Sequence, residues 1–389
     1  MPKAKHSPDG PLAGIRVLDF TALLQGPLAT QVLADLGADV VKVERVGGEW
    51  MRHWGICMSR THGETDAFLA FNRNKRSIEI DLKDTDDFER LLQLVDRADV
   101  VVENFRPGVM DKLGLGYEAL RERNPAMIYA ASSGYGQSGP YVKRPGQDYL
   151  MQALTGLMWL NGRRDDPPFL VGPAATDQYT GLHLVVGILA ALQHRNRTGE
   201  GQRVDVDLLS CVLAFQQQEL TVYLNHGEEL VRPVENIGHP GLTAPAGVYP
   251  TADGYLLLAM FPCPRLGEIL GVDWLAEYDT NEIMYVARDE VYRKLAQHFR
   301  DRNTAYWVEL LSAQDVWCAP VRKHSDIEQD PQIQHKRLIW EVPIGDNEAS
   351  FRTVGSPFTF SETPVRIRRG APRSGQDNDA FREDGIWSE

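Results

Sequence analysis

Short strand patterns alternate with helical patterns through the first third of the chain, and this alternation constrains the fold more than any other feature. Buried-strand patterns occur at residues 15–20, 39–44, 77–82, 99–105 and 127–132. Helical patterns lie between them at residues 26–36 and 85–97, the second with apolar side chains on one face. A βαβα order is typical of a parallel sheet covered by helices. The sequence therefore predicts an α/β fold built on a parallel sheet.

The remaining chain predicts a second, smaller domain. A length of 389 residues is more than one typical domain needs. The composition changes at residues 227–247, and a hairpin pattern at 248–260 precedes helical patterns at 288–300 and 305–311. We predict a large domain over residues 1–225, a small α+β domain over 226–325, and a C-terminal segment, 326–389, that returns to the large domain.

Composition excludes several classes of protein. A net charge of −13 argues against general nucleic-acid binding. The longest apolar run, residues 184–192, is too short to span a bilayer, and the N-terminus lacks the apolar core of a signal peptide. The four cysteines form no C-x-x-C pair, so we expect reduced thiols, no metal site and a cytoplasmic location. We expect neither nucleic acid nor a membrane as a partner.

Basic and polar side chains follow several of the predicted strands. Arg45 follows the second strand, Lys83 the third, and Asn104, Phe105 and Arg106 the fourth. Ligands of open α/β sheets bind outside the carboxyl ends of the strands, so these residues predict a polyphosphate site. The alternative that they are solvated loop charges stays open at this point.

One carboxylate, Asp177, opens a long apolar segment that carries no other formal charge before Arg195. The segment predicts a buried helix, so Asp177 is either a helix cap or a reactive group near the helix N-terminus. Asp148 follows a Gly- and Pro-rich turn and begins another helical pattern. It is either part of that helix start or a second carboxylate working near Asp177.

The glycine string GYGQSG at residues 134–139 is a weak motif. A dinucleotide fingerprint must open a helix after the first strand, whereas Pro140 and Pro145 follow here and oppose a helix. We therefore expect neither a nicotinamide nor a flavin cofactor. The chain also contains no G-x-S-x-G, H-E-x-x-H or Walker A string.

Several longer strings, taken together and in order, resemble one family. They are GPLATQVLADLGADVVKVE, NRNKRSIEIDLK, ADVVVENFRPGVMDKLGLGYE, GQDYLMQALTGLM and TDQYTGLHLVVGILAAL. The chain resembles the class III CoA-transferases of the formyl-CoA transferase and carnitine CoA-transferase type, the CaiB/BaiF family. The resemblance covers most of the chain and is strongest over residues 11–210. It implies a large Rossmann-like domain, a small domain and an interlocked homodimer.

The resemblance also implies roles for individual residues. Asp177 matches the nucleophilic aspartate of the family, and Asp148 lies where some members have a nearby glutamate. Coenzyme A, as acyl-CoA, would be held by the residues that match the family's binding segments: Leu24, Gln25, Arg45, Asp81, Leu82, Lys83, Asn104, Phe105, Arg106, Lys112, Gly134 and Gly136. Backbone N–H groups at residues 134–139 or at the start of the Asp177 helix are candidates for stabilising oxyanions.

The implied chemistry is covalent catalysis by a carboxylate. Asp177 would attack an acyl-CoA, become an aspartyl-CoA thioester, and pass CoA to an acceptor carboxylic acid. One alternative is an α-methylacyl-CoA racemase, but Gln147 stands where racemases resembling this chain have a histidine, and an amide is neither acid nor base. A CoA-binding protein without catalysis is the other alternative.

Substrate identity is less constrained by the sequence. Formyl-CoA transferases that resemble this chain carry a run of glycines in the small domain, and residues 236–248 (NIGHPGLTAPAGV) have none. This argues against formyl-CoA and oxalate as substrates. Arg232, His239 and Arg265 are candidates for contacting an acceptor carboxylate.

Overall fold

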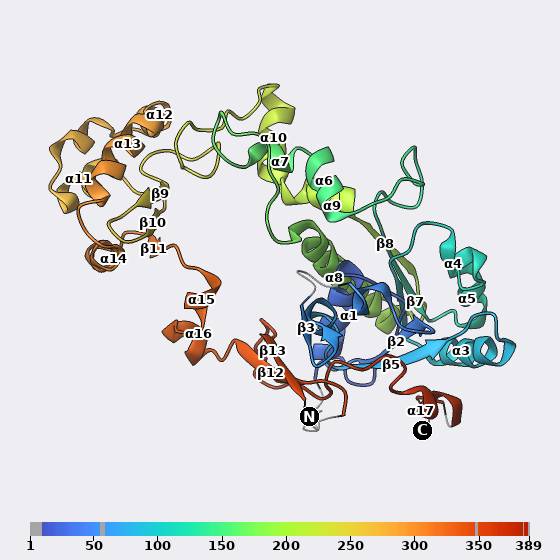
Figure 1. Cartoon of the computed structure of the whole chain (residues 1–389). Helices are drawn as coiled ribbons and strands as arrows, with labels where there is room; N and C mark the ends of the chain where they lie inside the picture. The colour runs from blue at the N-terminus through green and yellow to red at the C-terminus, as the bar shows by residue number, and fades with distance from the viewer. Residues whose placement is uncertain (1–9, 55–58, 347–348, 384, 388–389) are drawn as a thin grey trace, which may run out of the picture. The chain divides into compact units, whose positions relative to one another are not determined.

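The computed structural model describes residues 10–54, 59–346, 349–383 and 385–387. These residues form two compact units (Figure 1). Unit 1 comprises Met1–Met151, Ala174–Phe215 and Pro331–Glu389, and unit 2 comprises Gln152–Pro173 and Gln216–Asp330. The domain bounds inferred from the sequence stay a prediction. The N-terminal residues 1–9 and Cys57, both used in the sequence argument, lie outside the described residues.

Unit 1 is built on a six-stranded parallel sheet, as the strand and helix alternation predicted. Its strands are β1 (Arg16–Asp19), β2 (Asp39–Arg45), β5 (Lys75–Ile80), β6 (Val100–Glu103), β7 (Ile128–Ser133) and β8 (Arg203–Asp207). The order is β5-β2-β1-β6-β7-β8, and every neighbouring pair is parallel. The order reverses direction at β1 and β6, which is where ligands bind in such sheets.

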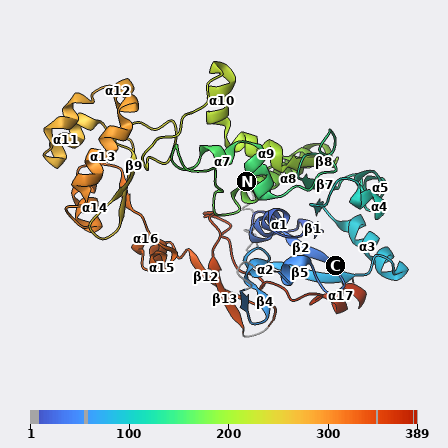
Figure 2. The ribbon, with the colours of Figure 1, turned by 45° about the horizontal axis from the view of Figure 1, so that its top comes forward.

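Side chains of the sheet alternate between two cores. Val17 in β1 belongs to the core under α1 (Gln25–Asp35) and α8 (Ala175–Thr198), whereas its neighbour Leu18 belongs to the opposite core. The α1 and α8 helices pack side by side (Figures 1 and 2). The inner strands β1, β6 and β7 are almost entirely buried because helices cover both faces of the sheet, which explains their mostly apolar sequences.

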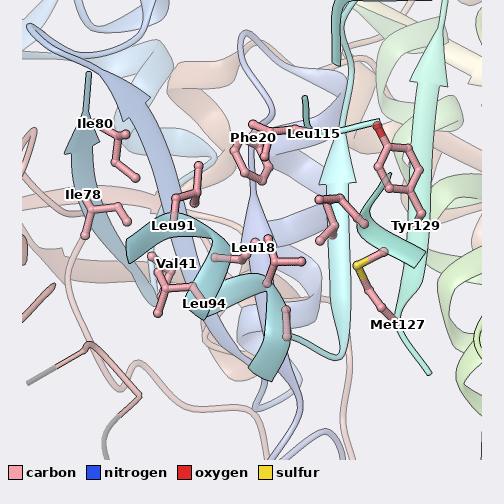
Figure 3. Packing of buried hydrophobic residues seen from close by; sticks show 14 of the residues in the cluster. Leu18, Phe20, Val41, Ile78, Ile80, Leu91, Leu94, Leu115, Met127 and Tyr129 are labelled. Atoms are coloured by element: carbon pink, nitrogen blue, oxygen red, sulfur yellow. The ribbon is translucent and has the colours of Figure 1, made fainter. Parts of the chain in front are cut away.

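The second core lies under α3 (Thr85–Arg97), α5 (Tyr117–Arg123) and α17 (Asn378–Glu383). Figure 3 shows Leu91 and Leu94 of α3 packed over strand side chains that include Leu18 and Val41. The bounds of α3 are those that the amphipathic pattern predicted. The helix begins at Thr85 because Asp84 caps it, accepting the N–H groups of Asp86 and Asp87 at 3.0 Å.

The C-terminal part of unit 1 closes the β5 edge of the sheet. The Asp377 carboxylate accepts the Ser77 N–H at 2.9 Å, and the Asn378 side chain accepts the Glu79 N–H at 2.8 Å. Phe381, Ile386 and Trp387 complete the core under α3. An open strand edge invites pairing with other chains, so this segment protects the sheet.

Unit 1 also contains elements outside the sheet and its main helices. They are η1 (Trp50–Arg52), β3 (Arg60–Thr61), β4 (Glu64–Thr65), α2 (Asp66–Ala70), α4 (Val109–Lys112), α9 (Leu208–Phe215), α16 (Pro331–His335), β12 (Ile339–Pro343) and β13 (Ser350–Val354). The helix α6 (Asp148–Leu154) begins in unit 1 and continues into the residues of unit 2.

Unit 2 is an α+β structure with a three-stranded antiparallel sheet. The sheet order is β11-β10-β9, formed by β9 (Gly247–Pro250), β10 (Tyr255–Leu258) and β11 (Cys318–Pro320). The predicted hairpin is therefore present as β9 and β10. Its helices are α7 (Leu157–Leu160), α10 (Gln217–His226), α11 (Cys263–Leu270), η3 (Asp273–Glu277), α12 (Asn281–Val286), α13 (Arg288–Phe299), α14 (Thr304–Ser312) and α15 (His324–Ile327). Across the described ranges, no helix has the length and apolar character needed to cross a membrane.

Candidate active site

Asp177 lies in the first turn of α8, but it does not cap that helix. The capping position is Ala174, which has no side chain able to accept a hydrogen bond. Asp148, at the start of α6, supplies the acceptor instead. Its Oδ2 atom accepts the Thr176 N–H at 2.9 Å, the Thr176 hydroxyl at 2.6 Å and the Asp177 N–H at 3.1 Å. The alternative that Asp177 is a helix cap is therefore wrong, because Asp148 performs that role.

The Asp177 carboxylate is electrostatically unfavourable in its ionised form. Burial first, and the neighbouring charge of Asp148 second, together raise its pKa to about 7. Within the described ranges, no group donates a hydrogen bond to this carboxylate that would offset the burial. A carboxylate that lacks stabilising donors is a better nucleophile than one held in an ion pair.

Asp177 lines a cavity of about 120 Å³ at the carboxyl ends of the strands. Six residues that the family resemblance assigned to coenzyme A line the same cavity: Leu24, Gln25, Asn104, Phe105, Arg106 and Gly134. These residues come from the β1–α1 connection, the segment after β6 and the segment after β7. The switch point of the sheet therefore gathers them around the carboxylate.

A second cavity of about 470 Å³ is more apolar. Arg45, Asp81, Leu82, Lys83 and Phe105 line it, so it collects the rest of the basic edge that the sequence indicated. Phe105 lines both cavities, which makes them neighbours. Three predicted residues line neither cavity: Lys112 precedes the lining residue Leu113, Gly136 lies further along its loop, and Asp148 lies under the start of α8.

The start of α1 packs closely against α8 beside Asp177. Gly181 lies one helical turn after Asp177, and a Cβ atom there would lie 2.6 Å from the Gln25 carbonyl oxygen. The Gln25 side-chain Nε2 donates to the Ser132 hydroxyl at 2.6 Å. Gly181 and Ser132 therefore fix the backbone and the side chain of Gln25 relative to Asp177. Neither residue was a candidate from the sequence.

The glycine string after β7 forms a tight loop rather than a helix start. Gly134 and Gly146 face each other so closely that a Cβ on Gly134 would lie 2.6 Å from the Gly146 Cα. The Gly136 N–H donates to the Ser133 hydroxyl at 3.0 Å. The N–H groups of Gly136, Thr176 and Asp177 thus have acceptors within the chain, and the oxyanion role inferred for residues 134–139 and the start of α8 stays a prediction.

Arg144 lines the Asp177 cavity and was missed in the sequence analysis. Its guanidinium lies 3.8 Å from the centre of the Tyr141 ring, and no acidic side chain pairs with it in the described part of the chain. The signal was present, because Arg144 is a basic residue in the loop that follows the fifth predicted strand. The same reasoning that selected Arg106 after the fourth strand would have selected Arg144.

The three small-domain candidates differ in their surroundings. Arg232 is buried and donates to the backbone carbonyls of Asn161 and Asp166, both at 2.8 Å, so its guanidinium holds a loop of unit 2. His239 pairs with Glu219 at 3.2 Å. Arg265 is exposed on α11. Elsewhere in the described ranges, no group of three His, Cys, Asp or Glu side chains could hold a metal ion.

Comparisons with known proteins agree with the fold and with the family resemblance. The family model described as "CoA-transferase family III" matches residues 12–378. A succinate–glutarate CoA-transferase of Agrobacterium fabrum is 38% identical over 94% of this chain and 93% of that protein. A succinyl-CoA:mesaconate CoA-transferase of Haloarcula hispanica is 37% identical over 91% of both chains. The crystal structure of a CaiB/BaiF family protein from Brucella suis has a TM-score of 0.85 and 32% identity, covering 96% of this chain and 99% of that one. The chain therefore belongs to CoA-transferase family III and is a class III acyl-CoA:carboxylate CoA-transferase.

Proposed function

We propose that Asp177 carries coenzyme A covalently between an acyl-CoA donor and a carboxylic acid acceptor. The observation that carries this proposal is a carboxylate with a raised pKa and no donor bonded to it, at the wall of the cavity lined by Leu24, Gln25 and Arg106. Charge is conserved in the exchange because each step consumes one carboxylate or thiolate and releases another. No external base is therefore required.

The exchange has four steps. An Asp177 oxygen attacks the thioester carbon, and the carbon–sulfur bond breaks to give a mixed anhydride and CoA thiolate. The thiolate then attacks the Asp177 carbonyl carbon, which releases the donor acid and leaves an aspartyl-CoA thioester. The acceptor carboxylate attacks that thioester, forming a second anhydride and thiolate. The thiolate finally attacks the acceptor acyl carbon and restores the Asp177 carboxylate.

The two neighbouring cavities support a binding mode for coenzyme A. The apolar cavity with Arg45 and Lys83 at its wall suits the nucleotide end, because guanidinium and ammonium groups bind phosphate oxygens. The cavity with Asp177 suits the thioester end. Phe105 would lie at the passage between them.

We propose a short dicarboxylic acid as a substrate. The two named relatives act on succinate and glutarate, and on succinyl-CoA and mesaconate. In this chain two guanidinium groups, Arg106 and Arg144, line the cavity of Asp177. A second substrate carboxylate would find a partner there, whereas a plain fatty acyl chain would not.

A homodimer is proposed on the family resemblance and on one surface feature. The α8 helix, predicted to be buried, leaves Leu182 46% and Val186 64% exposed. Phe215, at the end of the adjoining α9, is 47% exposed. Apolar surface of this kind is typical of an interface. Light scattering on the purified chain checks this: a mass of one chain would contradict it.

The covalent step is tested by trapping. The enzyme is incubated with succinyl-CoA, quenched with hydroxylamine and digested, and the peptide with Asp177 is examined by mass spectrometry. The proposal expects a hydroxamate at Asp177, and it expects Asp177→Ala to abolish both the label and the transfer. Asp96→Asn, which changes a surface carboxylate paired with Arg123, is the control and should behave like the parent. Normal transfer by a folded Asp177→Ala protein would overturn the proposal.

A further inference from the structure

The connection between β1 and α1 adopts a backbone conformation that a leucine does not favour. Leu23 has a φ of +70°, in the left-handed region where a Cβ atom crowds the backbone. Leu24 and Gln25 follow it directly and line the cavity of Asp177, as Leu23 itself does. Something must therefore hold this connection in place.

Side chains from three different segments hold successive backbone groups of this connection. The Lys42 ammonium donates to the Thr21 carbonyl at 2.7 Å. Asn104 accepts the Ala22 N–H at 2.9 Å and donates to the Ala22 carbonyl at 2.8 Å. Glu49 accepts the Leu23 N–H at 2.8 Å, so it acts on the residue with the unfavourable φ.

Glu49 is also held by a buried ion pair. Its Oε1 atom lies 2.9 Å from the Lys42 ammonium, and the two side chains are 6% and 0% exposed. The Leu23 N–H donates to the other oxygen of Glu49, Oε2. Glu49 therefore combines an acceptor for the Leu23 N–H with a charge that pairs with Lys42, and an amide at this position would leave the buried Lys42 ammonium without that charge.

We propose that Glu49 is a positioning residue, which holds the Leu23 backbone so that Leu24 and Gln25 stay in register with Asp177. This inference rests on the proposed covalent role of Asp177. The chain after Leu23 has little freedom to absorb a shift, because the Gln25 carbonyl packs against Gly181 on the helix of Asp177. A displacement at Leu23 therefore reaches the wall of the cavity.

Asp99 provides a matched control. One of its oxygens accepts the Arg16 N–H at 2.7 Å, and the other pairs with the Arg195 guanidinium at 2.7 Å. Asp99 thus also combines one backbone N–H with one ion-pair partner, but it precedes β6 at the amino ends of the strands. Asp99→Asn therefore measures the effect of losing a carboxylate with one backbone N–H and one ion-pair partner at a place away from the cavity.

The test compares Glu49→Gln with Asp99→Asn in the full-length enzyme. We expect Glu49→Gln to lower kcat, and the rate of Asp177 hydroxamate formation, by about 10- to 100-fold, with KM for succinyl-CoA changed less than about threefold. Asp99→Asn should change kcat by less than about threefold, even where it lowers Tm. Glu49→Asp keeps the buried charge paired with Lys42 and should give an intermediate kcat, so it serves if the amide variant fails to fold.

A double variant supplies the decisive readout. Glycine adopts a positive φ without strain, so Leu23→Gly reduces the need for the Glu49 contact. The kcat loss caused by Glu49→Gln should therefore be smaller in the Leu23→Gly background than in the parent. Equal losses in both backgrounds, or a Glu49→Asp protein with parental kcat, would overturn the inference. Absence of the Asp177 label in the parent would instead overturn the proposed function.

Discussion

The Asp148 carboxylate accepts the backbone N–H of Asp177 at 3.1 Å, and its charge disfavours ionisation of the Asp177 side chain. One residue therefore organises the first turn of α8 and adds to the effect of burial, which is the larger cause of the high pKa of Asp177. The hydrogen bonds go to one oxygen, Oδ2, which accepts from the N–H groups of Thr176 and Asp177 and from the Thr176 hydroxyl. The two roles can be separated by substitution.

Asp148→Asn removes the charge and keeps one acceptor oxygen for the helix start. The pKa of Asp177 should fall, because the repulsion from Asp148 is gone. The lower limb of the pH profile of kcat/KM should therefore move to lower pH. Asp148→Ala, which also removes the acceptor, should lose roughly 1 to 2 kcal/mol of unfolding free energy. A pH profile of Asp148→Asn that superimposes on the parent profile would contradict this role.

Asp177 should control the pH dependence of the first step. If the ionised form attacks the thioester, kcat/KM rises about tenfold per pH unit below the pKa of about 7 and levels off above it. The single-turnover rate of hydroxamate formation at several pH values measures this limb. A rate that is independent of pH across this range would exclude Asp177 as the titrating nucleophile.

The same raised pKa has a consequence for stability. Folding raises the pKa of Asp177 from 3.8 to about 7, so between these values the folded protein binds more protons than the unfolded chain. The parent protein therefore loses stability as pH rises through this window. The Asp177→Asn protein has no such carboxylate and does not lose stability in this way. The difference in Tm, variant minus parent, should therefore be larger at about pH 8 than at about pH 5. Equal Tm differences at both pH values would contradict the raised pKa.

Gly181 should be required for the close approach of α1 to α8. Gly181→Ala places a methyl group 2.6 Å from the Gln25 carbonyl oxygen, which belongs to backbone and cannot rotate away. We expect kcat to fall despite the better helix propensity of alanine, worth about 1 kcal/mol. Gly187→Ala is the control, because its methyl group would meet only a movable Val204 side-chain carbon at 2.7 Å. Similar kcat values for the two variants would argue against a special role for Gly181.

Arg144 should contribute to selection of dicarboxylic acids. Arg144→Gln removes a guanidinium from the Asp177 cavity, and a charge-assisted contact to a carboxylate contributes about 1.5 to 3 kcal/mol. We expect kcat/KM for succinate to fall about 10- to 100-fold, and for propionate to change much less. Steady-state assays with both acceptors and one donor measure the ratio. An equal loss for both acceptors would place Arg144 in CoA binding or in loop structure instead.

The sequence predicted the sheet and the helices with the strongest periodicity. Alternation of strand and helix patterns was sufficient for β1, β2 and α3, because buried strands and an amphipathic helix impose local patterns. It was not sufficient for α8, whose apolar sequence predicted burial although Val186 is 64% exposed. Periodicity reports which residues are apolar, whereas exposure depends on which elements are present to cover them.

The candidate site was only partly accessible from the sequence. The carboxyl ends of strands indicated Arg45 and Arg106, since that rule depends only on strand position. Ser132, Gly181 and Glu49 were missed, because their importance comes from contacts between segments far apart in the chain. No local pattern distinguishes a glycine that faces a carbonyl from one that faces solvent. For Asp148, the sequence left two roles open, and only the distances to Thr176 and Asp177 show that its side chain bonds to the start of α8.

The closure of the β5 edge has a consequence for how the protein is made. Strand β5 ends at Ile80, whereas the residues that seal it and complete its core lie between Asp377 and Trp387. At elongation rates of 5 to 20 residues per second, this sheet edge waits on the order of 15 to 60 s during synthesis for its cover. The nascent chain therefore passes through a period when a strand edge and an apolar face are both open. Binding by chaperones, or early aggregation, would concentrate in that interval.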